Sequence, residues 1–589
     1  MTGGTIRVLD ATGKAVTIAS NKVAASTGTY GPITLGNVFP YRVEACGMVG
    51  DKPVCVWGAT NLGGTLNLTP LTSAITMLAS GQSPSTLMTG AAQGLADTDM
   101  ATAQTQVRTA IAPALAEAGL ASDFDLLAGA LTTGAHTGYN RVLDTVDVGF
   151  GIDTKAYVTL TSRLGAGTAY LEPGVAQQGS LSLDAAATGL DLAGMNTLFS
   201  TMASGMLTND GCQAGLLPSL DANVRASSDT LVATGPELAA QVLCFRLAGA
   251  LPGVFGDLEK LFGGKLLPPI LDRCDFGAAD PVCRVSFVYQ TSKSFLRPLG
   301  IEQAAVKRPG GWLFLGNRLE VQASASARLV LARRVDSTAP DVFKRYLDIS
   351  IPVIGSLQCA RASQKDTTGA DVALALFKKA GSGRYLSLWS VSSSDGTPSL
   401  DPATGAVRGI DIVALPVPGG AAGDTTARNF VRAGRALKVE LFSDTGCSTP
   451  LAGADGASVS IDVAGQLPIA ANGMSGQPWP VFTAATALTG LKGAAGAKFN
   501  FAPTWTLPRS DVAVSRAQLC VLDASCSFKL AELELAGADL KAPLSAVVGT
   551  LALNAGDYKL LRITARTSDG LVLQLDNQSC AAQTSGLPC

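Results

Sequence analysis

The chain contains 589 residues, of which 47% are apolar and 15% are charged, and its formal net charge is −2. Its charged residues are spread without blocks, which excludes the concentrated cationic face that nucleic acids and anionic membranes require. A chain of this length exceeds one hydrophobic core, so we expect roughly three to five domains.

Apolar and polar residues alternate in residues 5–45, and turns such as residues 10–13 separate the alternating segments. This pattern predicts a small antiparallel β-sandwich. The segments TIRVLDATGKAV, STGTYGPITL and PYRVEACG, in this order, resemble the carboxypeptidase regulatory-like β-sandwich. That fold is a transthyretin-like module found at the start of many bacterial surface proteins and lipoproteins. The resemblance implies that residues 1–65 form such a module, with a structural or binding role rather than a catalytic one.

Residues 66–180 are predicted to form a helical segment that returns to strands and makes a composite unit with the first domain. Thr69 is placed as an N-cap, with Pro70 at the first helical position and Gly81 at the helix end. The motifs NLTPLT and HTGYNRVLDTVDV are similar to those of surface lipoproteins of the same type. A second helix over residues 97–115 is predicted from an apolar stripe at helical spacing, which comprises Met100, Ala103, Val107, Ile111 and Leu115.

Residues 185–340 are predicted to form an α+β middle domain. Pro236 is expected to begin one helix, and strands follow Cys283. The order of helices followed by a sheet that ends in GWLFLGN resembles the cone-shaped fold of nuclear-transport-factor-2-like domains. An apolar stripe at helical spacing is predicted to lie in the core, and it comprises Met195, Leu198, Phe199, Met202 and Met206.

The remaining residues predict β-structure throughout. Short alternating segments are separated by Gly and Pro turns, and a stretch rich in Gly, Ala and Ser lies at residues 452–457. This spacing predicts two β-sandwiches of immunoglobulin or fibronectin type, over residues 341–450 and 451–589. The whole chain is therefore predicted to be a multidomain, β-rich α+β protein.

Twelve cysteines are present, and most of them lie close to a partner in the sequence. An even count with this spacing predicts disulfides, which persist outside the cytosol. We therefore interpret Met1 as following a removed export signal, and we expect a lipid anchor in the full-length precursor. No apolar run approaches the roughly 18–20 residues of a membrane span. The predicted pairs are Cys46–Cys55, Cys212–Cys244, Cys274–Cys283, Cys359–Cys447, Cys520–Cys526 and Cys580–Cys589.

Catalytic chemistry finds little support in the sequence. The single histidine, His136, lies among turn-forming residues, and residues 473–477 (GMSGQ) lack the final glycine of a nucleophile elbow. One histidine cannot build a typical catalytic zinc site. Carboxylate pairs can hydrolyse glycosides without histidine, and the candidates are Asp144 with Asp147 and Asp123 with Asp125. We expect these four to be turn or solvated residues, so no catalytic residue is predicted.

Two binding features remain. Asp395, Asp401 and Asp411 lie in a loop-rich stretch that could offer oxygens to calcium, although no EF-hand loop is present. Calcium is therefore the only cofactor candidate. Trp479 lies between two prolines and is predicted to be exposed as a ligand-binding aromatic residue, whereas Trp389 and Trp505 are predicted to be core residues.

These observations indicate an exported bacterial protein, located on the cell surface or in the periplasm, with a non-catalytic binding, adhesion or structural role. Its expected partner is a surface polymer, a glycan, a protein or another copy of the chain. Two alternatives stay open. One is a self-assembling surface-layer or filament subunit, and the other is a carbohydrate-active hydrolase with accessory β-sandwiches.

Overall fold

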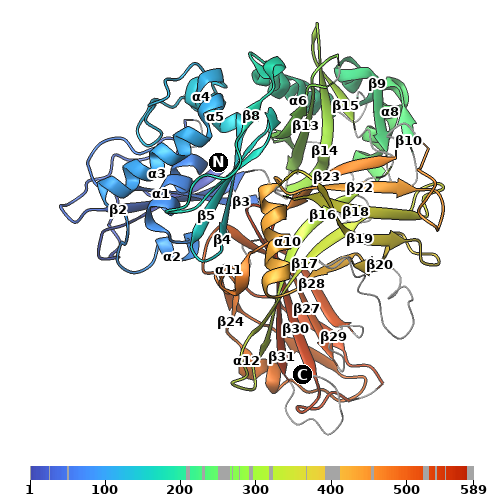
Figure 1. The fold of residues 1–589 in the computed structure, drawn as a ribbon. Helices are drawn as coiled ribbons and strands as arrows, with labels where there is room; N and C mark the ends of the chain where they lie inside the picture. The colour runs from blue at the N-terminus through green and yellow to red at the C-terminus, as the bar shows by residue number, and fades with distance from the viewer. Residues whose placement is uncertain are drawn as a thin grey trace.

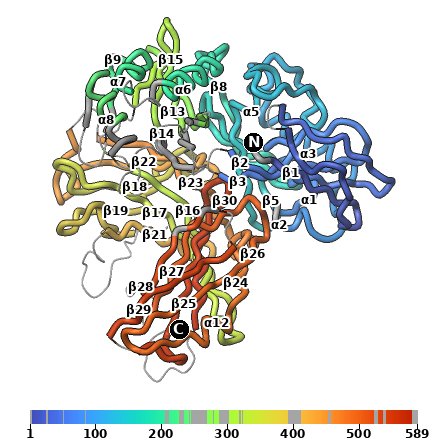
Figure 2. Tube along the Cα trace, turned by 180° about the vertical axis from the view of Figure 1, so that it is seen from behind, coloured from blue at the N-terminus to red at the C-terminus, as the bar shows by residue number. Residues whose placement is uncertain are grey.

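The computed structural model describes residues 2–579 and groups them into three lobes that meet at a common centre (Figures 1 and 2). The chain is divided into an N-terminal unit, a middle unit and a C-terminal unit, and the C-terminal unit extends from beside the middle unit into the downward lobe of Figure 1. Residues left out of the description within this range are 25–26, 50–51, 207–211, 228–231, 250–264, 268, 278, 291–295, 317–320, 322, 367, 392–410, 453–456, 522–528, 538–539 and 551.

The N-terminal unit begins with an antiparallel sheet in the order β1-β2-β3. Helices follow, and a second antiparallel sheet, β4-β5-β7, packs against them through a shared apolar core. The elements are β1 (Thr2–Leu9), β2 (Tyr41–Val49), β3 (Lys52–Thr60), α1 (Pro70–Ser80), α2 (Pro84–Leu87), α3 (Asp97–Ala110), α4 (Ala112–Glu117), α5 (Gly138–Thr145), β4 (Val146–Ile152), β5 (Ala156–Ser162), β6 (Gly165–Ala166), β7 (Thr168–Leu171) and β8 (Ser182–Leu183).

Helix α1 confirms the predicted boundaries. The Thr69 side chain accepts a hydrogen bond from the Thr72 backbone in a capping box, and Gly81 ends the helix in the left-handed conformation. The predicted helix over residues 97–115 is instead two helices that meet at Ile111. Pro113 explains the break, because it has no N–H to donate to the carbonyl of Thr109 and its ring crowds that turn.

The middle unit packs helices against a seven-stranded sheet in the order β10-β9-β15-β14-β13-β11, with β12 also paired to β13. Four residues of the predicted stripe are core: Met195, Leu198, Phe199 and Met202 are buried in one cluster with Phe314, whereas the side chain of Met206 lies outside the description. The elements are α6 (Leu192–Met206), α7 (Cys212–Leu216), β9 (Leu220–Ser227), β10 (Val232–Thr234), α8 (Pro236–Gly249), β11 (Lys265–Leu266), β12 (Ile270–Asp275), β13 (Val282–Gln290), β14 (Leu296–Arg308) and β15 (Gly311–Gly316).

The C-terminal unit is organised by a twelve-stranded sheet in the order β20-β19-β18-β22-β23-β16-β31-β30-β27-β28, with β17 paired to β16 and β21 paired to β17. Its strands are β16 (Ser324–Arg334), β17 (Val342–Ser350), β18 (Cys359–Lys365), β19 (Asp371–Lys378), β20 (Ser387–Val391), β21 (Ala414–Val417), β22 (Ala436–Phe442), β23 (Ser458–Ala464), β27 (Val512–Val521), β28 (Lys529–Gly537), β30 (Lys559–Thr567) and β31 (Val572–Ser579).

Shorter elements complete this unit. They include the helices α10, α11 and α12, so the prediction of β-structure throughout this region is wrong. Strand β16 forms parallel pairs with both β23 and β31. The sheet contains strands from both sides of residues 340 and 450, so the predicted domain limits stay a prediction, whereas the β-rich α+β class is confirmed. The shorter elements are α10 (Ala421–Arg432), α11 (Ala470–Ser475), β24 (Val481–Phe482), α12 (Ala485–Thr489), β25 (Lys498–Phe501), β26 (Trp505–Thr506) and β29 (Leu544–Val547).

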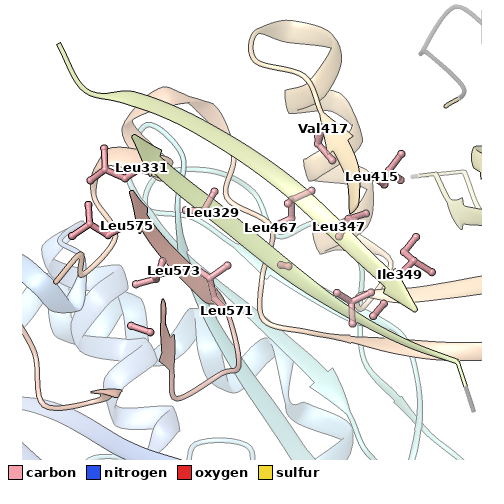
Figure 3. Close-up of a cluster of buried hydrophobic side chains, with 14 of the residues drawn as sticks. Leu329, Leu331, Leu347, Ile349, Leu415, Val417, Leu467, Leu571, Leu573 and Leu575 are labelled. Atoms are coloured by element: carbon pink, nitrogen blue, oxygen red, sulfur yellow. The ribbon is translucent and has the colours of Figure 1, made fainter. Parts of the chain in front are cut away.

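The core of the large sheet follows from strand alternation. Leu329 and Leu331 on β16, Leu347 on β17, and Leu573 and Leu575 on β31 point to one face and are buried (Figure 3). Each fully buried leucine contributes about 1.5–3 kcal/mol relative to an exposed one. The intervening residues of these strands face away from this core.

The N-terminal and C-terminal units approach closely along β4 and α11. A Cβ atom on Gly149 would lie 1.6 Å from Nε2 of Gln466, and one on Gly473 would lie 2.3 Å from the backbone oxygen of Ile152. The backbone contact at Gly473 therefore excludes any side chain there, whereas a side chain at position 149 would have to displace the Gln466 and Thr159 side chains. We call this contact the seam.

Ion pairs tie the three units together around the seam. Asp147 of β4 accepts from Arg163 at 2.8 Å and from Arg435 of the C-terminal unit at 2.9 Å. The middle unit is joined by Arg273, whose Nη1 lies 2.7 Å from Oδ1 of Asp462. These charged groups fix the relative positions of the units. None of the described helices combines the length and apolarity that a membrane crossing needs.

Buried tyrosines give a prediction for alkaline conditions. Burial raises the pKa of Tyr139, Tyr157 and Tyr170 above the usual value, and it raises the pKa of Tyr30 to about 12. Unfolded tyrosines lose their protons near pH 10, whereas these four keep theirs in the fold. Their contribution to stability is therefore complete below about pH 10 and is lost as the pH rises through the folded pKa values.

We expect a phenolate absorbance titration to show fewer than nine ionised tyrosines, the total in the chain, while the circular dichroism stays native. The buried tyrosines should ionise only when the protein unfolds. Ionisation of all nine before any change in circular dichroism would contradict the burial of these rings.

Candidate functional site

A groove of about 700 Å³ lies between the N-terminal sheet and a C-terminal segment at residues 506–510. Its size falls in the range of ordinary ligand-binding sites. Residues of β1 and β2 and the turn after α2 form one wall, and the C-terminal segment forms the other. The lining residues are Thr5, Ile6, Arg7, Asn21, Glu44, Cys46, Met88, Thr89, Thr506, Leu507, Pro508, Arg509, Ser510 and Leu540.

Three charged residues line the groove, Arg7, Glu44 and Arg509, and Arg7 is the most exposed of them. Its Nε lies 3.3 Å from Oε1 of Glu44, and half of its side chain stays exposed. The other carboxylate oxygen of Glu44 accepts from Nε1 of Trp57 at 2.9 Å. Because Trp57 fixes Glu44 from the buried side, Arg7 is held at the groove surface with hydrogen-bonding capacity to spare.

Arg509 forms the boundary between the groove and the interior. It makes a bidentate ion pair with Asp511, whose side chain is buried, and its guanidinium lies 5.5 Å from the centre of the Trp57 ring. A charge-assisted pair and a cation–π contact hold the same planar group. The C-terminal wall is thereby attached to the N-terminal sheet.

Arg42 positions the part of the wall that contains Met88 and Thr89. Its guanidinium is buried and donates to the carbonyl oxygens of Leu87 at 2.7 Å and Gly90 at 2.6 Å. Burial lowers the pKa of this guanidinium from its usual value. The turn after α2 is therefore fixed by hydrogen bonds that only a long, forked cation can reach.

A disulfide between Cys46 and Cys55 lies beneath the groove, and the Ser510 hydroxyl donates to Sγ of Cys46 at 3.0 Å. The Glu44 carboxylate lies within 4.8 Å of both sulfur atoms. These three residues include metal-ligand types, but the sulfurs are bonded to each other and are not thiolates. The arrangement is suited to binding a ligand and offers no thiol chemistry.

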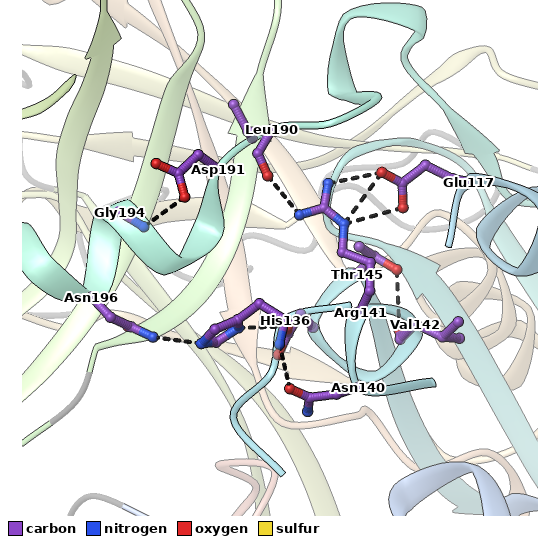
Figure 4. A network of polar contacts seen from close by, with 11 residues as sticks. Glu117, His136, Asn140, Arg141, Val142, Thr145, Leu190, Asp191, Gly194 and Asn196 are labelled. Carbon is purple, nitrogen blue, oxygen red and sulfur yellow. Dashed lines mark hydrogen bonds and ion pairs between the residues drawn. The ribbon is translucent and has the colours of Figure 1, made fainter. Parts of the chain in front are cut away.

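His136 lies among turn-forming residues in the sequence, and the structure gives it a structural role of longer range (Figure 4). Its Nδ1 lies 2.8 Å from Asp144, and Nδ2 of Asn196 lies 2.9 Å from its Nε2. An amide nitrogen only donates, so Nε2 accepts and Nδ1 carries the proton. His136 therefore connects the N-terminal unit to α6 of the middle unit, and its two nitrogens are both engaged.

Arg141 reinforces the same connection. It forms an ion pair with Glu117 at 2.9 Å in which both side chains are 7% exposed. It also donates to the backbone oxygen of Leu190 at 2.7 Å (Figure 4). Sequence periodicity offered no signal for this pair, because its partners lie on different helices.

Asp144 and Asp147 were expected to be turn or solvated residues, which is wrong: Asp144 lies in α5 and pairs with His136, and Asp147 lies in β4 and pairs with two arginines. Burial raises the pKa of Asp144, although the hydrogen bond from His136 opposes the shift. Burial also favours a higher pKa for Asp147, but the guanidinium groups of Arg163 and Arg435 outweigh it and hold that pKa below the usual value. Asp125 accepts from the backbone nitrogens of residues 127 and 128, and Asp123 is exposed. None of the four lines the groove.

The tryptophan predictions have mixed outcomes. Trp479 was predicted to be exposed, which is wrong: it is 8% exposed, and its Nε1 donates to the backbone oxygen of Met474 at 3.0 Å. Packing against Phe343 of β17 covers the ring. Trp505 is a core residue as predicted, whereas Trp389 is only half-buried and lies under the ammonium of Lys378.

The calcium candidates cannot be assembled from the described residues. Asp395 and Asp401 lie outside them. Asp411 has a positive φ of 58°, and its carboxylate accepts from the backbone nitrogen of Tyr385 at 2.8 Å. This contact is typical of a turn.

Four disulfides have the predicted pairing: Cys46–Cys55, Cys212–Cys244, Cys274–Cys283 and Cys359–Cys447. Cys520 is also disulfide-bonded. Its predicted partner, Cys526, and the predicted pair of Cys580 and Cys589 lie outside the described residues. Cys46 and Cys55 face each other on paired strands, as do Cys274 and Cys283.

Comparison with known proteins returned no matching family model and no matching curated protein. Among solved structures, the chain is similar to a DUF3823 family protein from Parabacteroides merdae ATCC 43184, at 9% identity and a TM-score of 0.13 over 43% of this chain and all of that one. It is also similar to a tetra-tandem repeat from the extending region of a large adhesion protein, at 12% identity and a TM-score of 0.12 over 99% of this chain and 92% of that one. At such TM-scores neither likeness carries an argument.

Proposed function

We propose that the protein is an exported bacterial protein of the cell surface or periplasm that binds a partner without catalysing a reaction. The groove between the N-terminal sheet and residues 506–510 is the observation that carries this proposal. The disulfides support an oxidising compartment. The regulatory-like module at residues 1–65 and a lipid anchor in the precursor belong to the same proposal.

The chemistry of the groove favours an extended ligand with both polar and apolar groups. Arg7 offers a cation at one wall, and the side chain of Leu540 at the other is 48% exposed. Threonine, serine and asparagine side chains between them offer hydrogen bonds. A surface glycan, another envelope polymer or a segment of a partner protein would satisfy this pattern. Hydrolysis has no comparable support, because the candidate carboxylates are engaged by protein groups or lie outside the groove.

Two substitutions in the groove test the proposal. We expect Arg7→Glu and Leu540→Asp each to weaken binding to an immobilised envelope polysaccharide or peptide ligand by about tenfold or more, because one reverses the exposed charge and the other removes apolar contact. The measurement is a dissociation constant by biolayer interferometry against a panel of purified cell-envelope polysaccharides and peptides.

Lys379→Glu and Leu62→Asp are matched controls, because both residues are exposed and lie outside the groove. They should leave the dissociation constant unchanged. Equal weakening by the control variants would contradict the groove as the binding site. Self-association in analytical ultracentrifugation that Arg7→Glu abolishes would instead identify another copy of the chain as the partner.

A further inference from the structure

Strands β22, β18, β19 and β20 lie side by side at one end of the large sheet, and their two faces differ (Figure 1). One face packs into the main core together with α10. The opposite face, which we call the outer face, presents the alternate side chains of these strands to the surface. It carries six charged residues, which are Arg361, Lys365, Asp371, Lys378, Lys438 and Glu440.

The two carboxylates of the outer face are neutralised by two of its lysines. Asp371 lies 2.6 Å from the Nζ atom of Lys365 and 3.7 Å from that of Lys438. The carboxylate of Glu440 lies 3.1 Å from the Nζ atom of Lys438. These four residues therefore form a balanced network and leave the other two cations of the face in excess.

The two remaining cations, Arg361 and Lys378, form no ion pair or hydrogen bond through their side chains within the described part of the chain. Each lies over an aromatic ring instead. The guanidinium carbon of Arg361 is 4.9 Å from the centre of the Phe442 ring, and the Nζ atom of Lys378 is 4.7 Å from the centre of the Trp389 ring. The rings hold both cations in place, and the N–H donors stay available to a ligand.

A β-bulge brings Trp389 to the outer face. Leu376 of β19 pairs with Ser390, whereas the next residue, Phe377, pairs with Leu388. Trp389 is thus the extra residue of β20, and a bulge of this kind turns a side chain to a new direction. The support for Lys378 is therefore a feature of the strand pairing and not a chance contact of two long side chains.

The two cations are close enough to contact one extended chain. Arg361 of β18 pairs with Leu376, and Lys378 lies two residues further along β19, opposite Cys359. Such diagonal neighbours have Cα atoms about 7–8 Å apart on the same face of a sheet. A ligand that repeats its negative charge along an extended backbone fits this arrangement.

We propose that the outer face binds a carboxylated polysaccharide. Arg361 offers a fork of donors that matches a carboxylate, and Lys378 offers a second positive charge. Serine hydroxyls on the same face, from Ser390 and from Ser458 and Ser460 of the neighbouring β23, can bind sugar hydroxyls.

The composition of the face favours a polysaccharide over an acidic protein. Protein interfaces usually have a desolvated apolar centre. On the outer face the apolar side chains that reach the surface are those of Leu376 and Trp389, and both are half-buried. The inference does not rest on the proposed function, because no residue of these four strands lines the groove.

The test uses polygalacturonate as the probe, with its methyl ester as the matched neutral polymer. We expect biolayer interferometry on the full chain to give a dissociation constant at least about tenfold lower for polygalacturonate, because esterification removes the charge-assisted hydrogen bonds. Arg361→Gln and Lys378→Gln should each weaken this binding by about fivefold or more. Arg566→Gln and Lys498→Gln are matched controls that should leave it unchanged, because both residues are exposed and lie outside the outer face.

Three outcomes would overturn the proposal. One is equal affinity for polygalacturonate and its methyl ester. Another is binding that is lost in Arg7→Glu but kept in Arg361→Gln and Lys378→Gln, which would locate the polymer in the groove and leave the proposed function intact. The third is tighter binding of poly-glutamate than of polygalacturonate, which would identify an acidic polypeptide as the occupant.

Discussion

Replacing Cys359 and Cys447 together by serine should lower the free energy of unfolding of the C-terminal unit by about 4–5 kcal/mol. The two cysteines are 88 residues apart in sequence, so their disulfide closes a long loop in the unfolded chain. Long loops lose more entropy on closure than short ones. Denaturant unfolding followed by circular dichroism, compared with the wild-type protein, measures the change.

The disulfide Cys46–Cys55 is the matched comparison, because it spans only nine residues. The same chain-entropy argument gives about 2–3 kcal/mol for its removal. Both disulfides are buried: Cys46–Cys55 joins two paired strands, whereas Cys359–Cys447 joins β18 to the turn that follows β22. An equal or larger loss on removing Cys46–Cys55 would show that local packing, rather than loop length, sets the contribution.

Local chemistry predicted the parts of the fold that depend on neighbouring residues. Thr69, Pro70 and Gly81 define α1 because caps and helix ends are set within a few residues. The close cysteine pairs follow for the same reason. The alternating strands of the C-terminal unit were visible in the sequence, because the buried face repeats every second residue.

Long-range features were not predictable in this way. Strand β16 pairs in parallel with β31, and Arg328 reaches Gln574 across 246 residues of sequence. Hydrophobic periodicity gives the face of a strand but not its neighbour. Trp479 illustrates the same limit, because its flanking prolines indicate a loop, while Phe343 from a distant strand covers it.

The binding groove needed tertiary structure for the same reason. It combines β1, β2 and the turn after α2 with residues 506–510, and no motif links them. Turn-forming neighbours indicated the local conformation of His136 correctly, but its bond to Asn196 spans 60 residues. The neighbouring residues in the sequence thus predict the backbone conformation of His136, whereas its contacts with another unit determine its structural role.

Arg345 lies where three segments of the C-terminal unit converge, and its side chain is 1% exposed. It donates to the carbonyl oxygens of Pro418 and Pro468 at 2.8 Å each and pairs with Asp424 of α10 at 2.7 Å. The same carboxylate accepts from the backbone nitrogen of Ala470, the first residue of α11 at the seam. One guanidinium therefore fixes β17, the start of α10 and the segment that leads into the seam.

Arg345→Met should lower the free energy of unfolding by about 3–5 kcal/mol, because it leaves a largely buried carboxylate and two carbonyl oxygens without their donor. Arg333→Met on β16 is the matched control: Arg333 also pairs with an aspartate, but its side chain is 36% exposed, and its loss should cost less than about 1 kcal/mol. Arg345→Lys should recover only part of the loss, since an ammonium cannot reach all three acceptors in the same fork geometry. Equal costs for Arg345→Met and Arg333→Met in denaturant unfolding would contradict the convergence of these segments on Arg345. A large loss of unfolding free energy in Arg345→Met but not in Arg333→Met would show that a single buried cation organises the C-terminal side of the seam.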